Sequence, residues 1–287
     1  MIVYADGGFR EKDEAFYPLE ERGVLFADGV YEVVRYDRGR PFEMDAHVRR
    51  LRASLAGIGL PWPGVEAAAS LSDELVRRNG LPDARVYWQV TRSAAGGPGK
   101  RSFVHPEKPE PAITMIAYPA EPLDPAAPVE AGEAVIVEDV RWHRCGIKSL
   151  MLLPASMAKT EAKRRGAVEA LFERAKPGAA GTHITEGSST NAFAVIGGVL
   201  RTHPADGWVL AGVTRAVLLE AARSAALAVE ERAFTRAELL AASEAFACST
   251  TQVTALTSVE GTPIGGGKAG EVTRRLAAAY VRRVLGA

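Results

Sequence analysis

Four prolines fall within the ten residues PAEPLDPAAP, at positions 119–128, and this segment constrains the fold more than any other. Proline fixes φ and removes a backbone donor, so we expect a stiff, extended linker here. A chain of 287 residues is long enough for about two domains that each bury a core. The sequence therefore predicts a small N-terminal domain over 1–118, a linker over 119–128 and a larger domain over 129–287.

Strand and helix patterns are mixed on both sides of this linker. The first part predicts a hairpin from Tyr31 around the turn DRGR, a helix capped by Asp45 that ends near Gly59, a helix over about 65–78, and strands over 86–92 and 112–118. The second part predicts strands at about 133–140, 168–173, 183–186, 191–196 and 245–250, and helices at about 155–165, 214–227 and 270–285. It also predicts a Gly-Gly hairpin turn in AVIGGVLRTH and a capping box in TRAE. The fold class is α/β or α+β, in two domains.

Composition excludes several classes of function. Lys+Arg and Asp+Glu are equal at 35 each, so no excess charge points to nucleic acid or to an anionic membrane. The N-terminal residues lack a signal-peptide pattern and no apolar run approaches ~18 residues, so we expect a cytoplasmic protein. Two cysteines make no disulfide framework, and five histidines show no metal-ligand spacing, so we expect no metal.

One lysine interrupts an apolar run in RCGIKSLMLLP, residues 144–154. The apolar neighbours of Lys148 are Ile147, Leu150, Met151, Leu152 and Leu153. Burial disfavours the charged form of a lysine. Lys148 therefore either lies at a strand edge with its ammonium in water, or is a buried amine whose free base serves covalent chemistry. The run by itself favours the first interpretation.

Three polar stretches downstream add possible partners for that lysine. ITEGSSTNAF places Glu186 at a strand end and Ser188 in the turn that follows. AGVTR places Val213 and Thr214 at a helix start, where free N–H groups and the helix dipole attract anions. STTQVT places Thr250 directly after a strand. Each stretch alone is more typical of a turn or cap, but together they indicate a phosphorylated cofactor, and no nucleotide-binding motif is present.

Pyridoxal 5′-phosphate requires this combination of an amine, a carboxylate and a phosphate site. The carboxylate keeps the ring nitrogen protonated, so that the ring can accept the electron pair left when the substrate Cα loses its proton. The amine must be free twice, first to attack the cofactor aldehyde and later to carry that proton. An apolar setting for Lys148 would favour both steps, and we interpret Lys148 as catalytic.

The chain also resembles a known family. ERGVLFADGVYEVV, HVRRL, EDVRWHRCGIKSLMLL, AKTEAKRRG, ITEGSSTNAF, GVTR and CSTTQVT occur in the order, and at nearly the spacing, of the fold-type-IV pyridoxal-phosphate enzymes. Within them the chain is most similar to the bacterial D-amino-acid transaminases, over almost its whole length. The resemblance implies a homodimer whose subunits have a small N-terminal α/β domain and a larger C-terminal pseudo-barrel domain.

The resemblance also implies roles for individual residues. Lys148 matches the Schiff-base lysine and Glu186 the partner of the pyridinium nitrogen. The matches to the phosphate site are Arg50, Val213, Thr214 and Thr250. Arg141 matches an arginine near the ring hydroxyl, Tyr31 matches a substrate-pocket tyrosine, and Ser188 is expected among the cofactor-binding residues. Without the resemblance, Arg50 could equally be a solvated helix residue and Tyr31 a core aromatic.

The chain departs from the family at a loop that contacts the substrate. The D-amino-acid enzymes carry an Arg-x-His pair that holds the substrate carboxylate, whereas this chain has SAAGGPGKRSFVHP at 93–106. We expect its Gly-rich part, SAAGGPGKRS, to be a mobile surface loop. Lys100, Arg101 or His105 would have to substitute. Ala27 and Met151 replace the more usual glycine and asparagine, and Met151 is expected to make the surroundings of Lys148 more apolar.

The predicted function is transamination between a D-amino acid such as D-alanine and a 2-oxo acid such as 2-oxoglutarate, with Lys148 as Schiff base and proton carrier. The alternatives within the superfamily are a transaminase for branched-chain L-amino acids or (R)-amines, and aminodeoxychorismate lyase. The alternative from another class is a small-molecule or phosphate-binding protein in which Lys148 is structural. The altered loop leaves the preferred amino acid and its enantiomer open.

Overall fold

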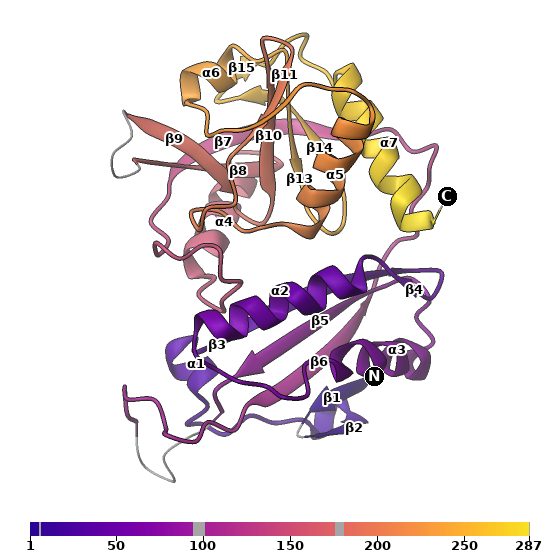
Figure 1. Cartoon of the computed structure of the whole chain (residues 1–287), viewed down its shortest axis with the longest axis vertical. Coiled ribbons are helices and arrows are strands. Elements are labelled where there is room, and N and C mark those ends of the chain that lie inside the picture. The colour runs from indigo at the N-terminus through magenta and orange to yellow at the C-terminus, as the bar shows by residue number, and fades with distance from the viewer. Residues whose placement is uncertain (6, 94–100, 176–180, 287) are drawn as a thin grey trace. The chain divides into compact units, whose positions relative to one another are not determined.

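The computed structural model describes residues 1–5, 7–93, 101–175 and 181–286. The chain forms two compact units, unit 1 with Met1–Leu123 and Ile147–Met151, and unit 2 with Asp124–Gly146 and Leu152–Ala287. Both contain helices and strands, which confirms the predicted two-domain α/β class (Figure 1). The change from unit 1 to unit 2 after Leu123 lies inside the predicted linker. As a division into independently folding domains, the boundaries at 118 and 129 stay a prediction.

Unit 1 is built on a six-stranded antiparallel sheet with the order β2-β1-β6-β5-β3-β4. Its strands are β1 (Ile2–Ala5), β2 (Gly8–Glu11), β3 (Gly29–Asp37), β4 (Arg40–Pro41), β5 (Ala84–Thr91) and β6 (Ala112–Pro119). Its helices are η1 (Lys12–Glu14), α1 (Arg22–Phe26), α2 (Met44–Gly57) and α3 (Ala67–Asn79). The predicted hairpin at DRGR is confirmed as the β3–β4 connection, where Arg38 and Gly39 have positive φ.

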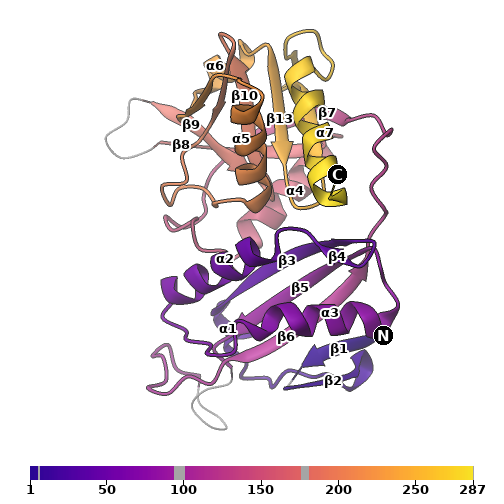
Figure 2. The same ribbon diagram turned by 45° about the vertical axis from the view of Figure 1, so that its right-hand side comes forward.

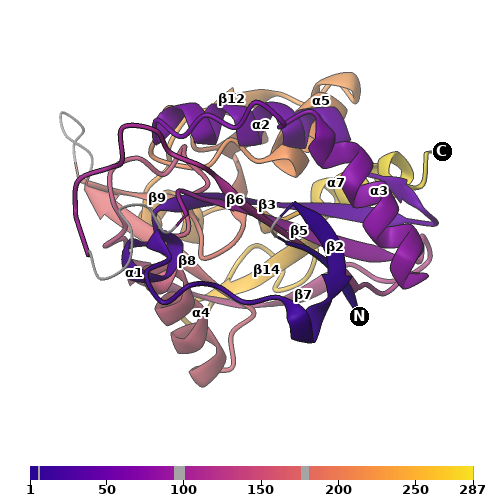
Figure 3. The same cartoon turned by 90° about the horizontal axis from the view of Figure 1, so that it is seen from below.

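Helices α2 and α3 cover one face of this sheet (Figures 1 and 3). Val30 and Val34 of β3 and Trp88 of β5 are buried against Leu51 of α2, because alternate residues of a strand face the same side. The predicted end of α3 is confirmed, with Gly80 as a left-handed C-cap.

The predicted cap of α2 is wrong. Glu43 is the N-cap, with φ of 50° and no side-chain cap bond, and Asp45 lies in the first turn of the helix. A carboxylate there still faces the positive end of the helix dipole. The preference of Asp for helix starts therefore holds at Asp45, but the N-cap of α2 lies two residues before the predicted one.

The segment Ile147–Met151 pairs with unit 1, although its flanking residues belong to unit 2. Ser149 forms an antiparallel bridge with Val30, the Tyr31 N–H donates to the Lys148 carbonyl at 2.9 Å, and the Leu150 N–H donates to Gly29 at 3.0 Å. A Cβ on Gly29 would lie 2.8 Å from the Leu150 side chain. Glycine at this position therefore lets the segment approach β3 closely.

Unit 2 is built on a mixed sheet of nine strands with the path β12-β11-β10-β13-β14-β7-β8-β9, in which β15 pairs with β14. Its strands are β7 (Glu130–Glu138), β8 (Glu169–Ala175), β9 (Thr182–Gly187), β10 (Asn191–Ile196), β11 (Val199–Thr202), β12 (Val229–Glu231), β13 (Glu244–Cys248), β14 (Val253–Val259) and β15 (Thr262–Pro263). Its helices are α4 (Leu153–Arg164), α5 (Val213–Ser224), α6 (Arg236–Leu240) and α7 (Glu271–Leu285). Helices α5 and α7 lie side by side (Figures 1 and 2).

Two local predictions for unit 2 are confirmed. Gly197 and Gly198 both have positive φ and form the turn between β10 and β11. Thr235 and Glu238 form both bonds of the capping box of α6. Both cysteines are free and buried. Over the described parts of the chain, no helix has the length and apolar character needed to cross a membrane.

Candidate active site

Lys148 is held by its backbone and lies next to Tyr31. Its N–H donates to Ser54 Oγ at 3.1 Å and its carbonyl accepts from Tyr31, while its Nζ lies 4.2 Å from the centre of the Tyr31 ring. This position allows a cation–π contact when the amine is charged. The residue as a whole is half-buried.

The expected apolar setting of Lys148 is only partly present. Ile147 packs against the core of unit 1. Met151, Leu152 and Leu153 are 45%, 39% and 72% exposed. Met151 is exposed in this chain, and its predicted contribution to apolar surroundings of Lys148 stays a prediction.

Arg50 is part of a buried cluster with Glu32 and His47. Its Nε and Nη2 donate to the two carboxylate oxygens of Glu32 at 2.7 and 2.8 Å, and Nδ1 of His47 lies 2.8 Å from Glu32. Burial acts to raise the pKa of Glu32, but the charge and hydrogen bonds of Arg50 outweigh it and hold that pKa well below its usual range. Glu32 is thus an anion that orients Arg50 on α2.

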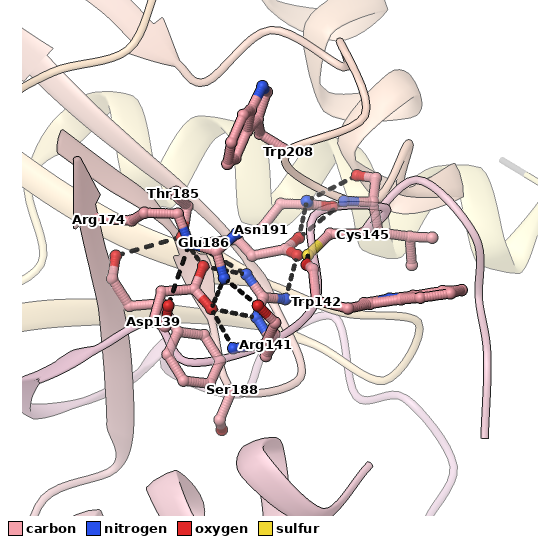
Figure 4. A network of polar contacts seen from close by, with 12 residues as sticks. Asp139, Arg141, Trp142, Cys145, Arg174, Thr185, Glu186, Ser188, Asn191 and Trp208 are labelled. Carbon is pink, nitrogen blue, oxygen red and sulfur yellow. Dashed lines mark hydrogen bonds and ion pairs between the residues drawn. The ribbon is translucent and has the colours of Figure 1, made fainter. Parts of the chain in front are cut away.

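Glu186 at the end of β9 is buried and surrounded by donors (Figure 4). Oε1 accepts from Arg141 Nη1 at 2.6 Å, and Oε2 accepts from Asn191 Nδ2 at 3.0 Å and from the Leu210 N–H at 3.1 Å. Burial raises the pKa of Glu186, against the charge and hydrogen bond of Arg141. Because every partner is an N–H donor, the arrangement suits a carboxylate that acts as acceptor.

Arg141 contacts Glu186 through one nitrogen and turns the others to a second carboxylate. Its Nε and Nη2 donate to the two oxygens of Asp139, each at 2.8 Å. Arg174 of β8 also donates to Asp139, at 2.8 Å. The arginine expected near a ring hydroxyl therefore belongs to a buried network of four charges.

The start of α5 provides a candidate anion site. Gly212 is the N-cap and contributes no side-chain bond, and a Cβ at this position would collide with Asn191. Thr214 Oγ1 is buried and has no hydrogen-bond partner among the described residues. An orphaned hydroxyl beside the free N–H groups of Val213 and its neighbours is the donor set that a phosphate requires.

Thr250 and Ser188 are held by other parts of unit 2. The Thr250 carbonyl accepts from the buried Tyr280 hydroxyl of α7 at 2.7 Å, which fixes the loop between β13 and β14. The Ser188 hydroxyl donates to Glu169 at 2.5 Å. The hydrogen of Ser188 is thereby committed to a protein carboxylate, and its role toward a cofactor stays a prediction.

The altered loop is described only in part. Lys100 and most of the Gly-rich segment, whose predicted mobility is untested, lie outside the described residues. The Arg101 guanidinium stacks 4.8 Å from the Phe26 ring and 5.0 Å from the Phe103 ring, and His105 Nε2 lies 3.6 Å from Asp28. Which of the three residues contacts a substrate carboxylate stays open.

Five residues of the candidate site were not predicted from the sequence: Glu32, His47, Asp139, Arg174 and Asn191. Two sequence signals were available for the first pair. Glu32 is a carboxylate at an inward position of a strand, between Val30 and Val34, and His47 is three residues before Arg50 on the helix that covers it. The others come from separate parts of the chain, Asp139 just after β7, Arg174 in β8 and Asn191 in β10, and no local pattern predicts their contacts. No cluster of three or more metal-ligating side chains occurs among the described residues.

Comparisons with known proteins agree with this geometry. The family model for amino-transferase class IV matches residues 29–259. The D-alanine aminotransferase of Listeria innocua serovar 6a is 38% identical over 288 residues, which cover 99% of this chain and 96% of the relative. The D-alanine aminotransferase of Staphylococcus aureus strain N315 is 38% identical over 277 residues, 96% of this chain and 94% of the relative.

A solved structure shares the fold over the full length. The branched-chain aminotransferase of the thermophilic archaeon Thermoproteus uzoniensis, solved with norvaline, superposes with a TM-score of 0.85 at 29% identity. The match covers 100% of this chain and 95% of that chain. The pseudo-barrel architecture expected of the larger domain agrees with this likeness.

Proposed function

Because the chain belongs to the amino-transferase class IV family and is an aminotransferase, we propose that it uses pyridoxal 5′-phosphate to transfer the amino group of D-amino acids such as D-alanine to 2-oxo acids such as 2-oxoglutarate. The relatives from Listeria and Staphylococcus are named D-alanine aminotransferases, which supports a D-amino acid as the substrate. They are 38% identical over nearly the whole chain, which supports the same substrate class here.

The described residues fit this cofactor. Thr214 offers a buried hydroxyl without a partner at a helix start, which suits the phosphate. Glu186 offers a buried carboxylate held by three N–H donors, which suits a protonated ring nitrogen. Lys148 offers an amine, and its backbone is held by hydrogen bonds to Ser54 and Tyr31. We assign to these residues, and to Arg50, Val213, Thr250 and Arg141, a role in binding pyridoxal phosphate.

The chain's own residues would then move the proton of the substrate Cα and stabilise the charge of the cofactor ring. When bound, pyridoxal phosphate supplies an aldehyde for the amino group and a ring that accepts electrons. Lys148 Nζ would hold the cofactor at that aldehyde, and the same nitrogen would accept the proton from the substrate Cα. Glu186 would stabilise a positive charge on the ring nitrogen, and Tyr31, which contacts Lys148, would line the substrate side.

The observation that carries this assignment is the surrounding of Glu186, a buried carboxylate that faces N–H donors only. A carboxylate with a purely structural role usually neutralises an arginine. Here Arg141 is already neutralised by Asp139, which it contacts side-on through Nε and Nη2. Glu186 therefore retains acceptor capacity for a further cationic donor.

The test compares Lys148→Ala with Lys163→Ala, which changes an exposed lysine of the next helix. The unchanged protein and Lys163→Ala should take up pyridoxal phosphate with a visible absorbance band that borohydride fixes. Lys148→Ala should lose both the fixation and transamination. An unchanged protein that stays colourless with added cofactor would contradict the proposal.

A second assay addresses the substrate. D-alanine with 2-oxoglutarate should give pyruvate, and L-alanine should not. The likeness to the branched-chain enzyme of Thermoproteus uzoniensis favours one rival, so L-leucine belongs in the same screen. Conversion of L-leucine but not D-alanine would favour that rival and reject the D-specific assignment.

We further propose that the protein forms a homodimer in the cytoplasm. Unit 1 exposes several large apolar side chains, and exposed apolar surface is typical of interfaces; among these side chains are Phe16, Leu19, Val24, Phe103 and Val104. Light scattering on the purified protein should give twice the mass of 30.6 kDa.

A further inference from the structure

Four charges of alternating sign lie next to each other in unit 2, three of them buried and the fourth, Arg141, partly buried (Figure 4). Arg174 contacts Asp139, Asp139 contacts Arg141, and Arg141 contacts Glu186. The side chains of Asp139 and Arg174 are 0% and 7% exposed. The network therefore carries no net charge, and removing one member from the middle would leave its neighbours without compensation.

Asp139 determines how the Arg141 guanidinium is turned. It binds Nε and Nη2 side-on, and it also accepts from the Arg141 backbone N–H at 3.2 Å. The Arg141 guanidinium lies 4.3 Å above the Phe172 ring, which fixes its plane. Only Nη1 is then directed to Glu186, and Arg141 binds a single oxygen of that carboxylate.

Asp139 is itself held from two sides. Arg174 donates to its Oδ1 at 2.8 Å and to its backbone carbonyl at 3.0 Å, and Arg174 also donates to the carbonyl of Arg141 at 2.5 Å. The Thr185 hydroxyl donates to Oδ2 at 3.0 Å. Burial acts to raise the pKa of Asp139, but the hydrogen bonds and charges of the two arginines lower it, so Asp139 stays an anion.

The alternative arrangement would bring the Arg141 guanidinium to both oxygens of Glu186, where it would compete for Oε2 with the two donors already there, Asn191 Nδ2 and the Leu210 N–H. A guanidinium released from Asp139 would pair side-on with Glu186, since two parallel bonds to one carboxylate are stronger than one. Arg141 would then neutralise both oxygens of Glu186. A ring nitrogen opposite Glu186 would lose part of the negative charge that stabilises its proton.

We propose that Asp139, held by Arg174 and Thr185, is a positioning residue that restricts Arg141 to one oxygen of Glu186 and so keeps Glu186 available to the cofactor ring. This role rests on the proposed function, because it assumes that Glu186 pairs with the ring nitrogen of pyridoxal phosphate. Asp139 and Arg174 themselves touch neither substrate nor cofactor in this assignment.

The experiment measures the dissociation constant and the visible band of pyridoxal phosphate on cofactor-free protein. Asp139→Asn removes the charge and keeps the shape, and we expect a dissociation constant about tenfold higher and a displaced band, because one charged interaction is lost. Glu138→Gln changes the exposed neighbouring carboxylate and should keep both values.

A second pair of variants covers the case in which Asp139→Asn does not fold. Thr185→Val removes the hydroxyl that holds Asp139 while all four charges remain, and we expect about a threefold weaker binding with the same direction of band shift. Thr185→Ser retains the hydroxyl and should restore both values. A merely structural role would lower thermal stability without moving the band.

Two results would overturn the inference, and they differ from each other. If Asp139→Asn and Thr185→Val bind pyridoxal phosphate with unchanged constant and band, Asp139 does not position Arg141. If the unchanged protein itself fails to bind pyridoxal phosphate through Lys148, the proposed function falls and the inference falls with it.

Discussion

Glu32 in unit 1 and Glu186 in unit 2 are both buried carboxylates beside an arginine of the candidate site, but the arginines contact them differently. Arg50 binds Glu32 side-on through Nε and Nη2. Arg141 gives its side-on contact to Asp139 and reaches Glu186 through Nη1 alone. In unit 1 the carboxylate thus supports the arginine, whereas in unit 2 the arginine supports the carboxylate. The ion pair in unit 1 therefore orients a positive group, Arg50, and the ion pair in unit 2 orients a negative group, Glu186.

The two clusters also differ in their response to pH. Unit 1 includes His47, whose pKa is lowered because burial disfavours its charged form, against the hydrogen bond and charge of Glu32. Its Nε2 is buried without a partner among the described residues. The network around Glu186 contains two arginines and two carboxylates and no imidazole. Mild acid should therefore affect the cluster around Glu32 through an imidazole, a group that the network around Glu186 lacks.

The largest effect is expected from Glu32→Gln. This change removes the charge that compensates the buried Arg50 guanidinium, and breaking a buried pair from one side costs about 3–5 kcal/mol of unfolding free energy. Urea unfolding of the cofactor-free protein measures it. Glu74→Gln, which changes a carboxylate paired with Arg77 on the surface, should have no measurable effect. Equal effects of the two variants would contradict the supporting role of Glu32.

The second prediction concerns pH. Above the ordinary histidine pKa of about 6.5, neither the folded nor the unfolded chain protonates His47. Below it the unfolded chain binds a proton that folded His47 resists, so this part of the stability is lost as pH falls, with a slope of up to about 1.4 kcal/mol per pH unit. Unfolding free energies from pH 8 to 5 should show this slope.

A matched pair of variants isolates the histidine. His47→Gln should flatten the slope by up to one proton equivalent, and His143→Gln, at an exposed position, should leave it unchanged. An identical slope in all three proteins would mean that His47 does not distinguish the two clusters.

The smallest effect is expected from Asn191→Ala in unit 2. Asn191 Nδ2 donates to Glu186 and to the Leu210 carbonyl, and the loss of these two hydrogen bonds from an uncharged amide should cost about 1–2 kcal/mol. Glu186 retains Arg141 and the Leu210 N–H. A loss as large as that from Glu32→Gln would show that Asn191, and not Arg141, is the main support of Glu186.

The sequence predicts those parts of the molecule that depend on neighbouring residues. The left-handed cap at Gly80, the Gly-Gly turn and the capping box at Thr235 follow from local backbone preferences. Ala27 is a further local feature. Its φ of 54° lies in the left-handed region, which favours glycine and explains why glycine is usual at that position.

Contacts between distant residues could not be predicted in this way. Lys148 and Glu186 stand out as chemical groups, but the partners of Glu186 come from three places in the chain, Arg141, Asn191 and Leu210. A hydrophobic run likewise does not show which of its members are buried. Met151 proved exposed because the bridge to β3 involves only the residues before it.

The excursion of Ile147–Met151 into unit 1 has a consequence for anyone who divides or permutes the gene. A cut after Leu123 would give a first fragment whose β3 lacks the bridge at Val30, and a second fragment that carries Lys148 without the strand that holds it. Neither fragment would be a complete unit. New chain ends are better introduced at the Gly197–Gly198 turn, where only one hairpin of unit 2 is opened.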